Sequence, residues 1–537
     1  MRVQSHIAYL AASLLSLPLL SEGYQWPDPI DAIEELYSVT DGLGASNVVF
    51  PITPCGFSPL STSGRQAAAE WIRTAYHDMA TADAAAGTGG IDASLGFETD
   101  RGENVGPAFN TTMGFLATFQ NSHASLADLI ALGTVLSVRI CSGPSVPMRV
   151  GRVDATSAGP FGVPEPQQDL SSHTASFAKQ GFNVSEMIGL VACGHTIGGV
   201  HETEFPTVVT GLINSDNNTS GMQHFDDSFS KFDNHIAVQW VNSSTSDDAL
   251  ATGFNTTMDS DARIFAADNN ATMRDLASSN DVFNNRCGEL LGRMLDTVPK
   301  GVTLTDPIAP VPVKPWNAQL SIDSNGNIQL EGNVRIFSSD PAETFDGYTV
   351  NIAWTDRNGA SCDGCTAPAT FQGTSSGTIW DGAVRFFHFN TTIDPAVGFS
   401  AFTVQFSTTA GGVVTTADNN GAGFAISDGV MVQPATSCVM SDGTVNIVAA
   451  VRNDQTVSSA SVSFTSAETQ VGSVGRLMVP STASLTRTTS SASSLYDLYS
   501  SQFVVGIAAS SSFDLSVDLG GTTHTDAFNL VKNLNSC

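Results

Sequence analysis

A proline-rich segment divides the chain into two parts with different hydrophobic patterns. Residues 304–316 read LTDPIAPVPVKPW and contain four prolines, which favours a stiff, extended linker. Before it, stretches such as SLADLIALGTVLSVRI (125–140) carry apolar residues at helical intervals. After it, stretches such as AQLSIDSNGNIQLEGNVRIF (318–337) alternate apolar and polar residues about an Asn-Gly turn, as a β-hairpin does. The pattern predicts a mainly α region followed by an all-β, sandwich-like region.

The length and composition allow several domains. The chain has 537 residues, of which 41% are hydrophobic, so it can bury sizeable cores in two or three domains. We divide it into a signal peptide (1–23), a mainly α domain (24–298), a linker (299–316) and an all-β region (317–537). The segments 402–426 and 513–531 look loosely alike, so the β region is either one domain or two similar β units.

The start of the chain has the pattern of a secretory signal. Arg2 lies in a short polar region, an apolar stretch covers residues 7–20, and cleavage is expected near Gly23. The apolar stretch is too short for a membrane span and no later segment qualifies, so we expect a secreted, extracellular protein without a membrane partner. Eight glycosylation sequons fit a secreted glycoprotein, although such triplets also arise by chance in Ser/Thr-rich sequence. They lie at Asn110, Asn183, Asn217, Asn218, Asn242, Asn255, Asn270 and Asn390.

Acidic residues dominate the charge of the chain. The formal net charge is −30 and the pI is near 4.4. A field of this sign repels nucleic acid and anionic lipid at long range. We therefore expect no nucleic acid among the partners.

An arginine and a histidine stand four residues apart in RTAYHD (73–78). The flanking AAAEW favours a helix, so Arg73 and His77 emerge on one face, one turn apart. A permanent cation beside an imidazole combines electrostatic stabilisation with acid–base chemistry. A second histidine, His195, ends an apolar helical run in VACGHTIGGVH, where a histidine by itself is more often a core residue.

These histidine motifs belong to an ordered series. RTAYHD, GGIDAS, ENVG, SLADLIALG, GRVDA, CGHTIGG, FDN and MDSDA follow one another along the chain. In this order and approximate spacing, residues 55–295 resemble a secreted fungal haem peroxidase, the class II type of the plant, fungal and bacterial peroxidase superfamily, with an added C-terminal β region. The resemblance implies a mainly α peroxidase fold, one haem b, two calcium ions and a hydrogen-peroxide-dependent oxidoreductase. Such an enzyme oxidises small, phenolic electron donors through high-valent iron-oxo intermediates.

The resemblance assigns roles on the distal side of the haem. His77 would be the acid–base catalyst, and Arg73 would stabilise the charge that develops as the O–O bond breaks. Asn104 matches the residue whose carbonyl accepts from Nδ1 of the distal imidazole, and Glu98 matches the acidic residue that ties this asparagine towards the distal metal. Tyr76 departs from the commoner phenylalanine or tryptophan at its position.

On the proximal side, His195 resembles the axial ligand of the haem iron. Asp261 in MDSD matches the carboxylate that bonds to its other nitrogen and raises its basicity, with Asp259 as the nearest rival. His201 has a family counterpart near a haem propionate.

The resemblance also implies two calcium sites built from oxygen ligands. The distal site would use Asp78, Gly90, Asp92 and Ser94. The proximal site would use Thr196, Asp226, Ser228 and Asp233. The alternative is that both segments are ordinary acidic loops in an acidic chain.

Eight cysteines in an oxidising route favour disulfides over thiol chemistry. By resemblance, Cys55 pairs with Cys141. The CDGC motif, Cys362 and Cys365, favours a local disulfide over a zinc site because no second cysteine pair accompanies it. Cys438 and Cys537 delimit the last β stretch and are expected to pair, whereas Cys193 and Cys287 are either bridged or free.

Some residues that the family uses for particular electron donors are replaced in this sequence, which narrows the range of donors we expect. Manganese oxidisers of this family use three carboxylates beside a propionate, but the matching positions here are Gln66, Glu70 and His201. The surface tryptophan of lignin-type enzymes is replaced by Leu190. We therefore expect hydrogen peroxide and small reducing substrates, oxidised at the exposed haem edge.

The sequence also leaves other functions open. The β region could contact polysaccharide or another surface, act as an interaction module, or stabilise its neighbour. A hydrolytic metalloenzyme built on His77, His195 and His201 lacks compact ligand spacing. A non-catalytic, adhesive or surface-binding glycoprotein on a peroxidase-like fold is the main alternative, although decay would be expected to remove Arg73, His77 or His195 first, and all three are present.

Overall fold

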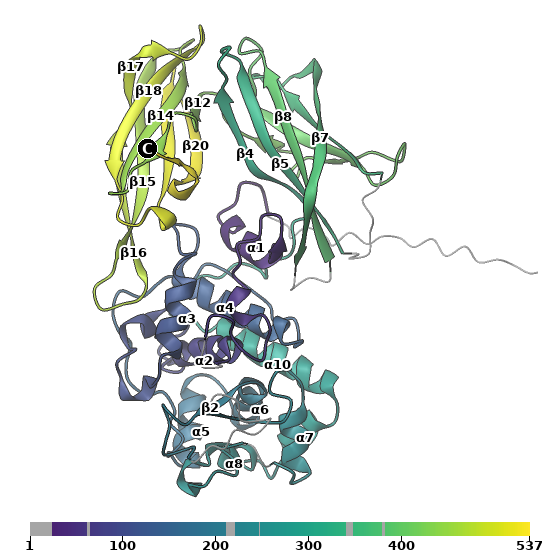
Figure 1. The fold of residues 1–537 in the computed structure, drawn as a ribbon, viewed down its shortest axis with the longest axis vertical. Coiled ribbons are helices and arrows are strands. Elements are labelled where there is room, and N and C mark those ends of the chain that lie inside the picture. Colours follow the sequence, from purple (N-terminus) through teal and green to yellow (C-terminus); the bar gives the residue numbers. More distant parts are fainter. Residues whose placement is uncertain (1–23, 62–64, 211–220, 246–247, 340–346, 378–381) are drawn as a thin grey trace, which may run out of the picture.

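The computed structural model describes residues 24–61, 65–210, 221–245, 248–339, 347–377 and 382–537. A helical part occupies one end of the long axis, and two β units lie at the other end (Figure 1). The prediction of a mainly α region followed by an all-β region is confirmed. The expected signal peptide, Asn217 and Asn218 lie outside the described residues. Within the described residues, no helix is long and apolar enough to cross a membrane.

The helical part is built around one almost wholly buried helix, α4 (Leu126–Ile140). A helix that is apolar on every side belongs in a core, and α2 (Ala67–Met79), α3 (Ala108–Leu116) and α1 (Asp31–Ser38) pack against it. The other described helices are α5 (Leu170–Lys179), α6 (Val184–His195), α7 (His235–Val241), α8 (Ser260–Phe265), α9 (Ala271–Ala277) and α10 (Asn280–Leu295). Two short strands, β2 (Gly199–His201) and β3 (Met222–His224), pair antiparallel beyond α6.

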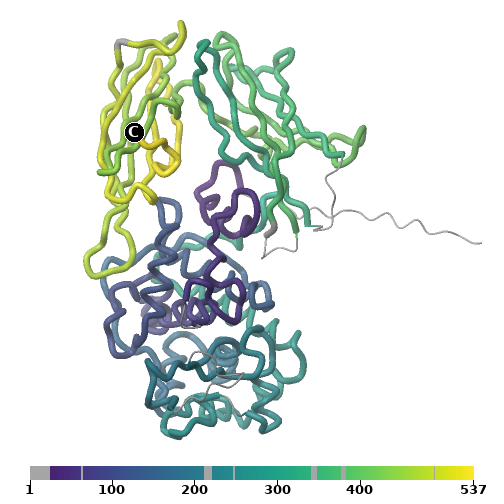
Figure 2. Tube along the Cα trace, in the orientation of Figure 1, coloured from purple at the N-terminus to yellow at the C-terminus, as the bar shows by residue number. Residues whose placement is uncertain are grey.

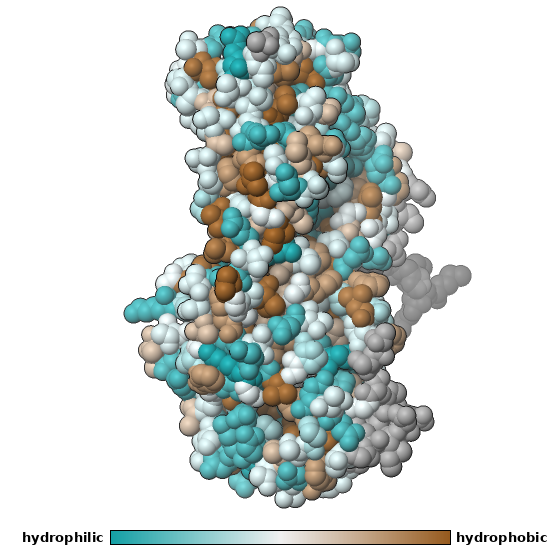
Figure 3. Space-filling view, turned by 60° about the vertical axis from the view of Figure 1, so that its left-hand side comes forward, coloured by the Kyte–Doolittle hydropathy of each residue, from teal (hydrophilic) through white to brown (hydrophobic). Residues whose placement is uncertain are grey.

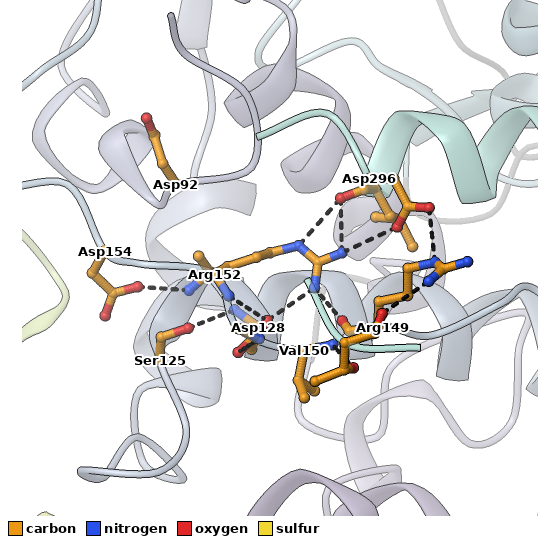
Figure 4. A network of polar contacts seen from close by, with 12 residues as sticks. Asp92, Ser125, Asp128, Arg149, Val150, Arg152, Asp154 and Asp296 are labelled. Carbon is orange, nitrogen blue, oxygen red and sulfur yellow. Dashed lines mark hydrogen bonds and ion pairs between the residues drawn. The ribbon is translucent and has the colours of Figure 1, made fainter. Parts of the chain in front are cut away.

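A buried arginine fixes the loop that follows α4 (Figure 4). Arg152 Nη1 donates to Asp128 Oδ1 (2.9 Å), and Arg152 Nη2 donates to the carbonyl of Leu295 at the end of α10 (2.7 Å). Asp154 accepts the first free N–H groups of α4, from Leu126 (2.9 Å) and Ala127 (2.8 Å). The charge pair and the helix cap therefore hold α4, α10 and this loop in one arrangement.

The predicted linker is docked on the helical part. The N–H groups of Thr305 and Ile308 donate to the carbonyls of Val150 (2.9 Å) and Met148 (2.7 Å). Strand β4 begins at Val313, earlier than the expected end of the linker at residue 316. The hydrogen bonds of Thr305 and Ile308 give the linker a fixed path along the surface of the helical part, whereas a flexible spacer would have no fixed path.

The first β unit is a nine-stranded sheet in the order β10-β9-β6-β7-β8-β5-β4, with β1 on β7 and β11 on β9. Its strands are β1 (Asp41–Gly42), β4 (Val313–Ile322), β5 (Ile328–Ser338), β6 (Thr349–Thr355), β7 (Ser361–Gly377), β8 (Gly382–Ile393), β9 (Ala401–Ser407), β10 (Thr415–Ala417) and β11 (Phe424–Ala425). The predicted hairpin is confirmed, because β4 and β5 pair with Ile322 opposite Ile328. Gly326 takes φ +84° in its turn, a conformation that glycine adopts without strain.

The second β unit is a sandwich of a six-stranded and a four-stranded sheet. Its strands are β12 (Val430–Val432), β13 (Cys438–Val439), β14 (Thr444–Arg452), β15 (Val457–Thr469), β16 (Arg476–Ser484), β17 (Thr486–Ser491), β18 (Tyr496–Val504), β19 (Ser512–Leu519), β20 (Thr522–Leu530) and β21 (Asn535–Ser536). The two units bury separate main cores. The two segments that look alike in sequence form antiparallel pairs, β9–β10 in the first unit and β19–β20 in the second.

The β units contact each other and the helical part. The N–H of Ile322 donates to Gln433 Oε1 between the two units (3.1 Å). The β15–β16 hairpin descends onto the helical part (Figure 2). There, Gln120 and Arg476 exchange two hydrogen bonds, at 3.0 and 2.9 Å. Over the face drawn in Figure 3, exposed apolar side chains are scattered among polar ones, as is normal for a protein surface.

Helix α1 joins the helical part to the first β unit, although the sequence places it in the mainly α domain. Its apolar residues Ile33 and Tyr37 belong to the helical core. Its acidic side faces two fully buried cations, with Glu34 Oε2 2.7 Å from Lys314 Nζ and Glu34 Oε1 2.6 Å from Arg335 Nη2. Burial alone would raise the pKa of Glu34, but these two cations lower it.

Four disulfides account for all eight cysteines. The pairs are Cys55–Cys141, Cys193–Cys287, Cys362–Cys365 and Cys438–Cys537. The pairing of Cys193 with Cys287, left open by the sequence, joins α6 to α10. The short loop in CDGC closes as a disulfide, which removes its thiols as zinc ligands.

Candidate active site

A cavity of about 300 Å³ opens between α2 and α6. His77 lies in its wall on α2 and His195 on α6, at the end of each helix. Most of the remaining wall is apolar, with Phe177, Leu190, Ile264, Leu291 and Met294 among its side chains. Such a cavity, apolar with a few converging polar groups, is the usual form of a cofactor or substrate site.

The distal side of the cavity holds His77 in one tautomer. His77 Nδ1 lies 2.8 Å from Asn104 Oδ1. Because Asn104 Nδ2 donates to the carbonyl of Glu98 (3.0 Å), Oδ1 is the acceptor and Nδ1 carries the hydrogen. Burial lowers the pKa of His77 well below its ordinary value, and the charge of Arg73 lowers it further, against the opposing bond to Asn104. Nε2 is therefore a neutral, unprotonated nitrogen.

Arg73 lies one turn from His77 and is fixed by its surroundings. Its Nη2 donates to the carbonyl of Val105 (3.2 Å), and its guanidinium lies 4.4 Å from the ring centre of Phe109. Burial lowers the pKa of Arg73 to about 10, so the side chain is still a cation at neutral pH. A fixed cation in an apolar wall suits the stabilisation of charge that appears on a small bound molecule.

Glu98 contacts Asn104 through its backbone carbonyl, because its carboxylate binds other groups. Glu98 Oε1 accepts the N–H of Gly159 (2.6 Å), and Oε2 lies 3.1 Å from Arg101. The link that the sequence predicts between Glu98 and Asn104 thus runs through the Glu98 carbonyl.

The proximal side presents His195 at the C-terminal end of α6. Asn183 and Glu186 form a capping box at the start of this helix. His195 Nδ1 lies 2.6 Å from Asp261 Oδ2, and the imidazole stacks on Phe225 with ring centres 4.2 Å apart. Asp259, the rival in the sequence, makes no such bond among the described contacts. With Nδ1 held by a buried carboxylate, Nε2 of His195 is free to act as a metal ligand.

The arrangement fits a haem. One imidazole, His195, has its Nδ1 held and its other nitrogen available, and the second, His77, lies in the same cavity with its own Nδ1 held. His201 also lies in the cavity wall, where the resemblance places a propionate neighbour. Apolar walls and a held histidine ligand are what a haem site requires.

The residues expected at the proximal cation site converge beside His195. Thr196 Oγ1 donates to the carbonyl of Asp233 (2.5 Å), and Ser228 Oγ donates to Asp233 Oδ1 (2.8 Å). Asp226 Oδ2 is buried and has no hydrogen-bond partner among the described residues. Burial and the nearby charge of Asp233 raise the pKa of Asp226 to about 7. Two buried carboxylates with an unpartnered oxygen, a hydroxyl and a carbonyl form a donor set that suits calcium.

At the distal cation site, the main carboxylate is more fully hydrogen-bonded by the protein itself. Both oxygens of Asp78 accept backbone N–H groups, from Asp92 (3.0 Å), Ala93 (2.8 Å) and Leu95 (3.0 Å). Burial and the charge of Asp92 raise the pKa of Asp78. Ser94 and Gly90 lie in the same loop, and Gly90 approaches the Thr297 carbonyl so closely that a Cβ atom would clash. Within the described ranges, no group of three or more His, Cys, Asp or Glu side chains is arranged to hold a metal ion, so each candidate site depends on carbonyl and hydroxyl oxygens.

In one part of the cavity wall the structure brings together residues that the sequence does not connect. Arg65 lies between Glu70 (2.5 Å) and Glu204 (3.0 Å). Gln66 Nε2 donates to the carbonyl of Phe229 (2.8 Å). Glu204 lies 139 residues from Arg65, and no local motif marks it. The only carboxylate expected at the manganese position, Glu70, is thus already paired with an arginine.

His173 and Tyr76 also lie in the cavity wall, and only Tyr76 is marked by a motif in the sequence. His173 is buried, and neither ring nitrogen has a hydrogen-bond partner in the part of the chain that the structure describes. Tyr76 stacks on Phe177 with ring centres 5.9 Å apart, which places a phenol in the position noted for its departure from the commoner residues. Leu190 is buried in the wall and is not a surface residue.

Comparisons with known proteins find peroxidases among the sequences similar to this chain. Residues 58–280 match the family model described as Peroxidase. A WSC domain-containing protein of Arthroderma benhamiae is 40% identical over 387 residues, which is 71% of this chain and 52% of that protein. The peroxisomal L-ascorbate peroxidase 5 of Arabidopsis thaliana is 31% identical over 142 residues, 26% of this chain and 50% of that protein. The mitochondrial cytochrome c peroxidase of Emericella nidulans is 31% identical over 138 residues, 24% of this chain and 37% of that protein.

The chain spans about half the length of the first two of these relatives. Its helical part contains a peroxidase-family domain, and a β-rich region follows it.

Proposed function

We propose that the chain is a haem peroxidase that reduces hydrogen peroxide and oxidises small, phenolic donors. The observation that carries this proposal is the pair of held histidines in one cavity, His77 bonded to Asn104 and His195 bonded to Asp261. When bound at His195, the haem group as a whole would supply the two electrons that cleave the O–O bond and would recover them from the donors.

The distal residues of the chain handle protons and charge. Nε2 of His77 accepts a proton from one peroxide oxygen and returns it to the departing oxygen, which leaves as water. Arg73 stabilises the negative charge on that oxygen while the bond breaks. In balance, one hydrogen peroxide takes up two electrons and two protons to give two waters, and each of two phenols loses one electron and one proton.

The proximal carboxylate sets the basicity of the ligand. Asp261 is buried and accepts the Nδ1 hydrogen of His195. Partial negative charge on the imidazole strengthens the donation of electrons from Nε2 to a bound metal.

Calcium at the two loop sites is part of the same proposal. The unpartnered Asp226 oxygen beside Asp233 supports the proximal site more strongly than the fully bonded Asp78 supports the distal one. Metal analysis of the purified protein checks the expected two ions per chain.

We further propose that the protein is a secreted glycoprotein of the class II peroxidase type. Its four disulfides are those of an oxidising compartment. Several sequon asparagines are exposed, namely Asn110, Asn183, Asn242 and Asn390. Glycosidase treatment of the natural protein, followed by mass measurement, tests this assignment.

The adhesive alternative has one specific observation in its favour. The 40% identical relative is described by its WSC domain and not as a peroxidase. A non-catalytic binding protein would retain the fold and would adsorb to an insoluble polysaccharide or cell surface through the β region. Co-sedimentation with such surfaces, with and without the β units, measures that property separately from turnover.

Turnover of hydrogen peroxide with guaiacol in haem-loaded protein is the direct test. We expect two guaiacol molecules to be oxidised per peroxide, and no acceleration by micromolar Mn²⁺, because Arg65 already neutralises Glu70. A haem-loaded protein that leaves peroxide and guaiacol unchanged would refute the proposed enzyme and favour the adhesive alternative.

A further inference from the structure

The cavity wall contains four glutamates, and three of them have partners. Glu70 and Glu204 share Arg65, at 2.5 and 3.0 Å. Glu103 Oε2 accepts the N–H groups of Gly162 (3.0 Å) and Val163 (3.2 Å). These three carboxylates are therefore neutralised or held by the protein.

Glu165 is the fourth, and its carboxylate makes no hydrogen bond or ion pair with any residue that the structure describes. Its backbone, in contrast, is fixed. The N–H of Glu165 donates to Gln168 Oε1 (3.2 Å), its carbonyl accepts from the Gln168 N–H (3.1 Å), and Arg263 donates to the carbonyl of Pro166. Pro164 and Pro166, on either side, also lie in the cavity wall and restrict the backbone further. The fold thus presents one free negative charge at a fixed place on the wall.

Negative charges outnumber positive ones in the wall around it. The wall carries the four glutamates against two guanidiniums, those of Arg65 and Arg73, while Asp261 is bonded to His195. The whole chain has a formal net charge of −30. A cleft with low-dielectric walls focuses such a field and changes the local concentration of charged small molecules.

We propose that Glu165 is a specificity-determining residue that makes this cavity favour cationic and neutral aromatic donors over anionic ones. The inference rests on the proposed function and names its substrate class. A protonated aromatic amine would be attracted to the wall, lose one electron there, and leave as a radical cation after releasing a proton, with two donors consumed per peroxide. A sulfonated or carboxylated donor would be repelled.

The test compares three donors on haem-loaded, full-length protein. N,N-dimethyl-p-phenylenediamine in mildly acidic buffer is the cation, guaiacol is neutral, and ABTS carries two sulfonates. Two quantities are measured at low and high ionic strength: kcat/KM with peroxide, and Kd by equilibrium dialysis without peroxide. The variant is Glu165→Gln, and the matched control is Glu331→Gln, which removes the same charge from β5 in the first β unit, where Glu331 is 44% exposed.

At low ionic strength, Glu165→Gln should weaken the binding of the cation and lower its kcat/KM, each about two- to fourfold. For ABTS, binding should become stronger and kcat/KM should rise by a similar factor. Both quantities should stay unchanged for guaiacol. High salt should shrink the difference, because the Debye length falls below about 10 Å above 0.1 M. Glu331→Gln should behave as the unaltered protein does.

The outcomes separate the two proposals. Oxidation of all three donors with no change in Glu165→Gln, or an equal change in Glu331→Gln, overturns the role of Glu165 and leaves the peroxidase assignment standing. Charge-selective binding without turnover of any donor overturns the peroxidase assignment and supports Glu165. If the protein shows neither charge-selective binding nor turnover of any donor, both the role of Glu165 and the peroxidase assignment are refuted.

Discussion

The hydrogen bond between His77 and Asn104 decides which imidazole nitrogen can act as a base. Replacing His77 by Leu removes that base but leaves the proximal His195–Asp261 pair intact. We expect haem to be retained and the reaction with peroxide to slow by about 10²- to 10⁴-fold. Stopped-flow recording of the Soret band measures the rate. His235→Leu, at an exposed histidine, is the control, and an unchanged rate in His77→Leu would show that the distal assignment is wrong.

The pKa of His77 predicts a characteristic pH profile. Burial and Arg73 lower this pKa well below the ordinary value, so the imidazole stays neutral as the pH falls through about 6.5. The rate with peroxide should therefore stay level from neutral pH into the acid range and fall only below the lowered pKa. In Arg73→Leu the rate should be lower throughout, and its acid limb should move to higher pH. An acid limb at the ordinary histidine pKa in the unaltered protein would contradict this account.

At the scale of elements, the end of α6 and the loop 225–233 form one unit. Thr196 at the end of α6 bonds to Asp233, next to the iron-binding candidate His195. Because calcium bound to the native state adds to its stability, removal of calcium should loosen the loop and let His77 approach the iron from the distal side.

The expected result of prolonged chelation is a six-coordinate, low-spin haem spectrum with loss of activity, reversed by added Ca²⁺ if it is supplied early. Metal analysis must show that calcium has left. A spectrum and an activity that do not respond in calcium-free protein would exclude the coupling between loop and haem.

The local patterns of the sequence predict elements well where each element carries its own signal. The helical period of α4 and the alternation about the turn at Gly326 both appear in the structure as expected. The position of α1 does not follow from its sequence, because acidic residues on a helix normally indicate a solvated face. Its partner Arg335 lies 301 residues away from Glu34, and a pattern read over a few turns cannot connect them.

The same distinction applies within the site. Arg73 and His77 are one turn apart on α2, so their proximity is visible in the sequence. The pair of Arg65 with Glu204 is created only by the packing of the loop after β2 against α2, and so it was missed. Likewise, the burial of His173 depends on the surrounding helices and not on its neighbours in sequence.

At the scale of the whole molecule, the buried ion network fixes the helical part to the first β unit. Glu34→Ala would leave Arg335 buried without its carboxylate partner and would remove one of the two close carboxylates of Lys314, the other being Asp31. We expect a loss of about 3–5 kcal/mol in the free energy of unfolding, measured by chemical denaturation. Glu35→Ala is the matched control, because the Glu35 side chain is 40% exposed and its carboxylate lies 3.7 Å from Lys314. Equal losses in the two variants would show that the network does not depend on Glu34.

The assignment of a haem peroxidase is tested by the absorption spectrum of full-length protein supplied with haem, recorded before and after one equivalent of hydrogen peroxide. We expect a Soret band that changes on addition of peroxide and is restored by two equivalents of a phenol, since the cavity places His195 to bind iron and His77 to serve the peroxide. A protein that takes up no haem, or a Soret band that peroxide leaves unchanged, would contradict the assignment.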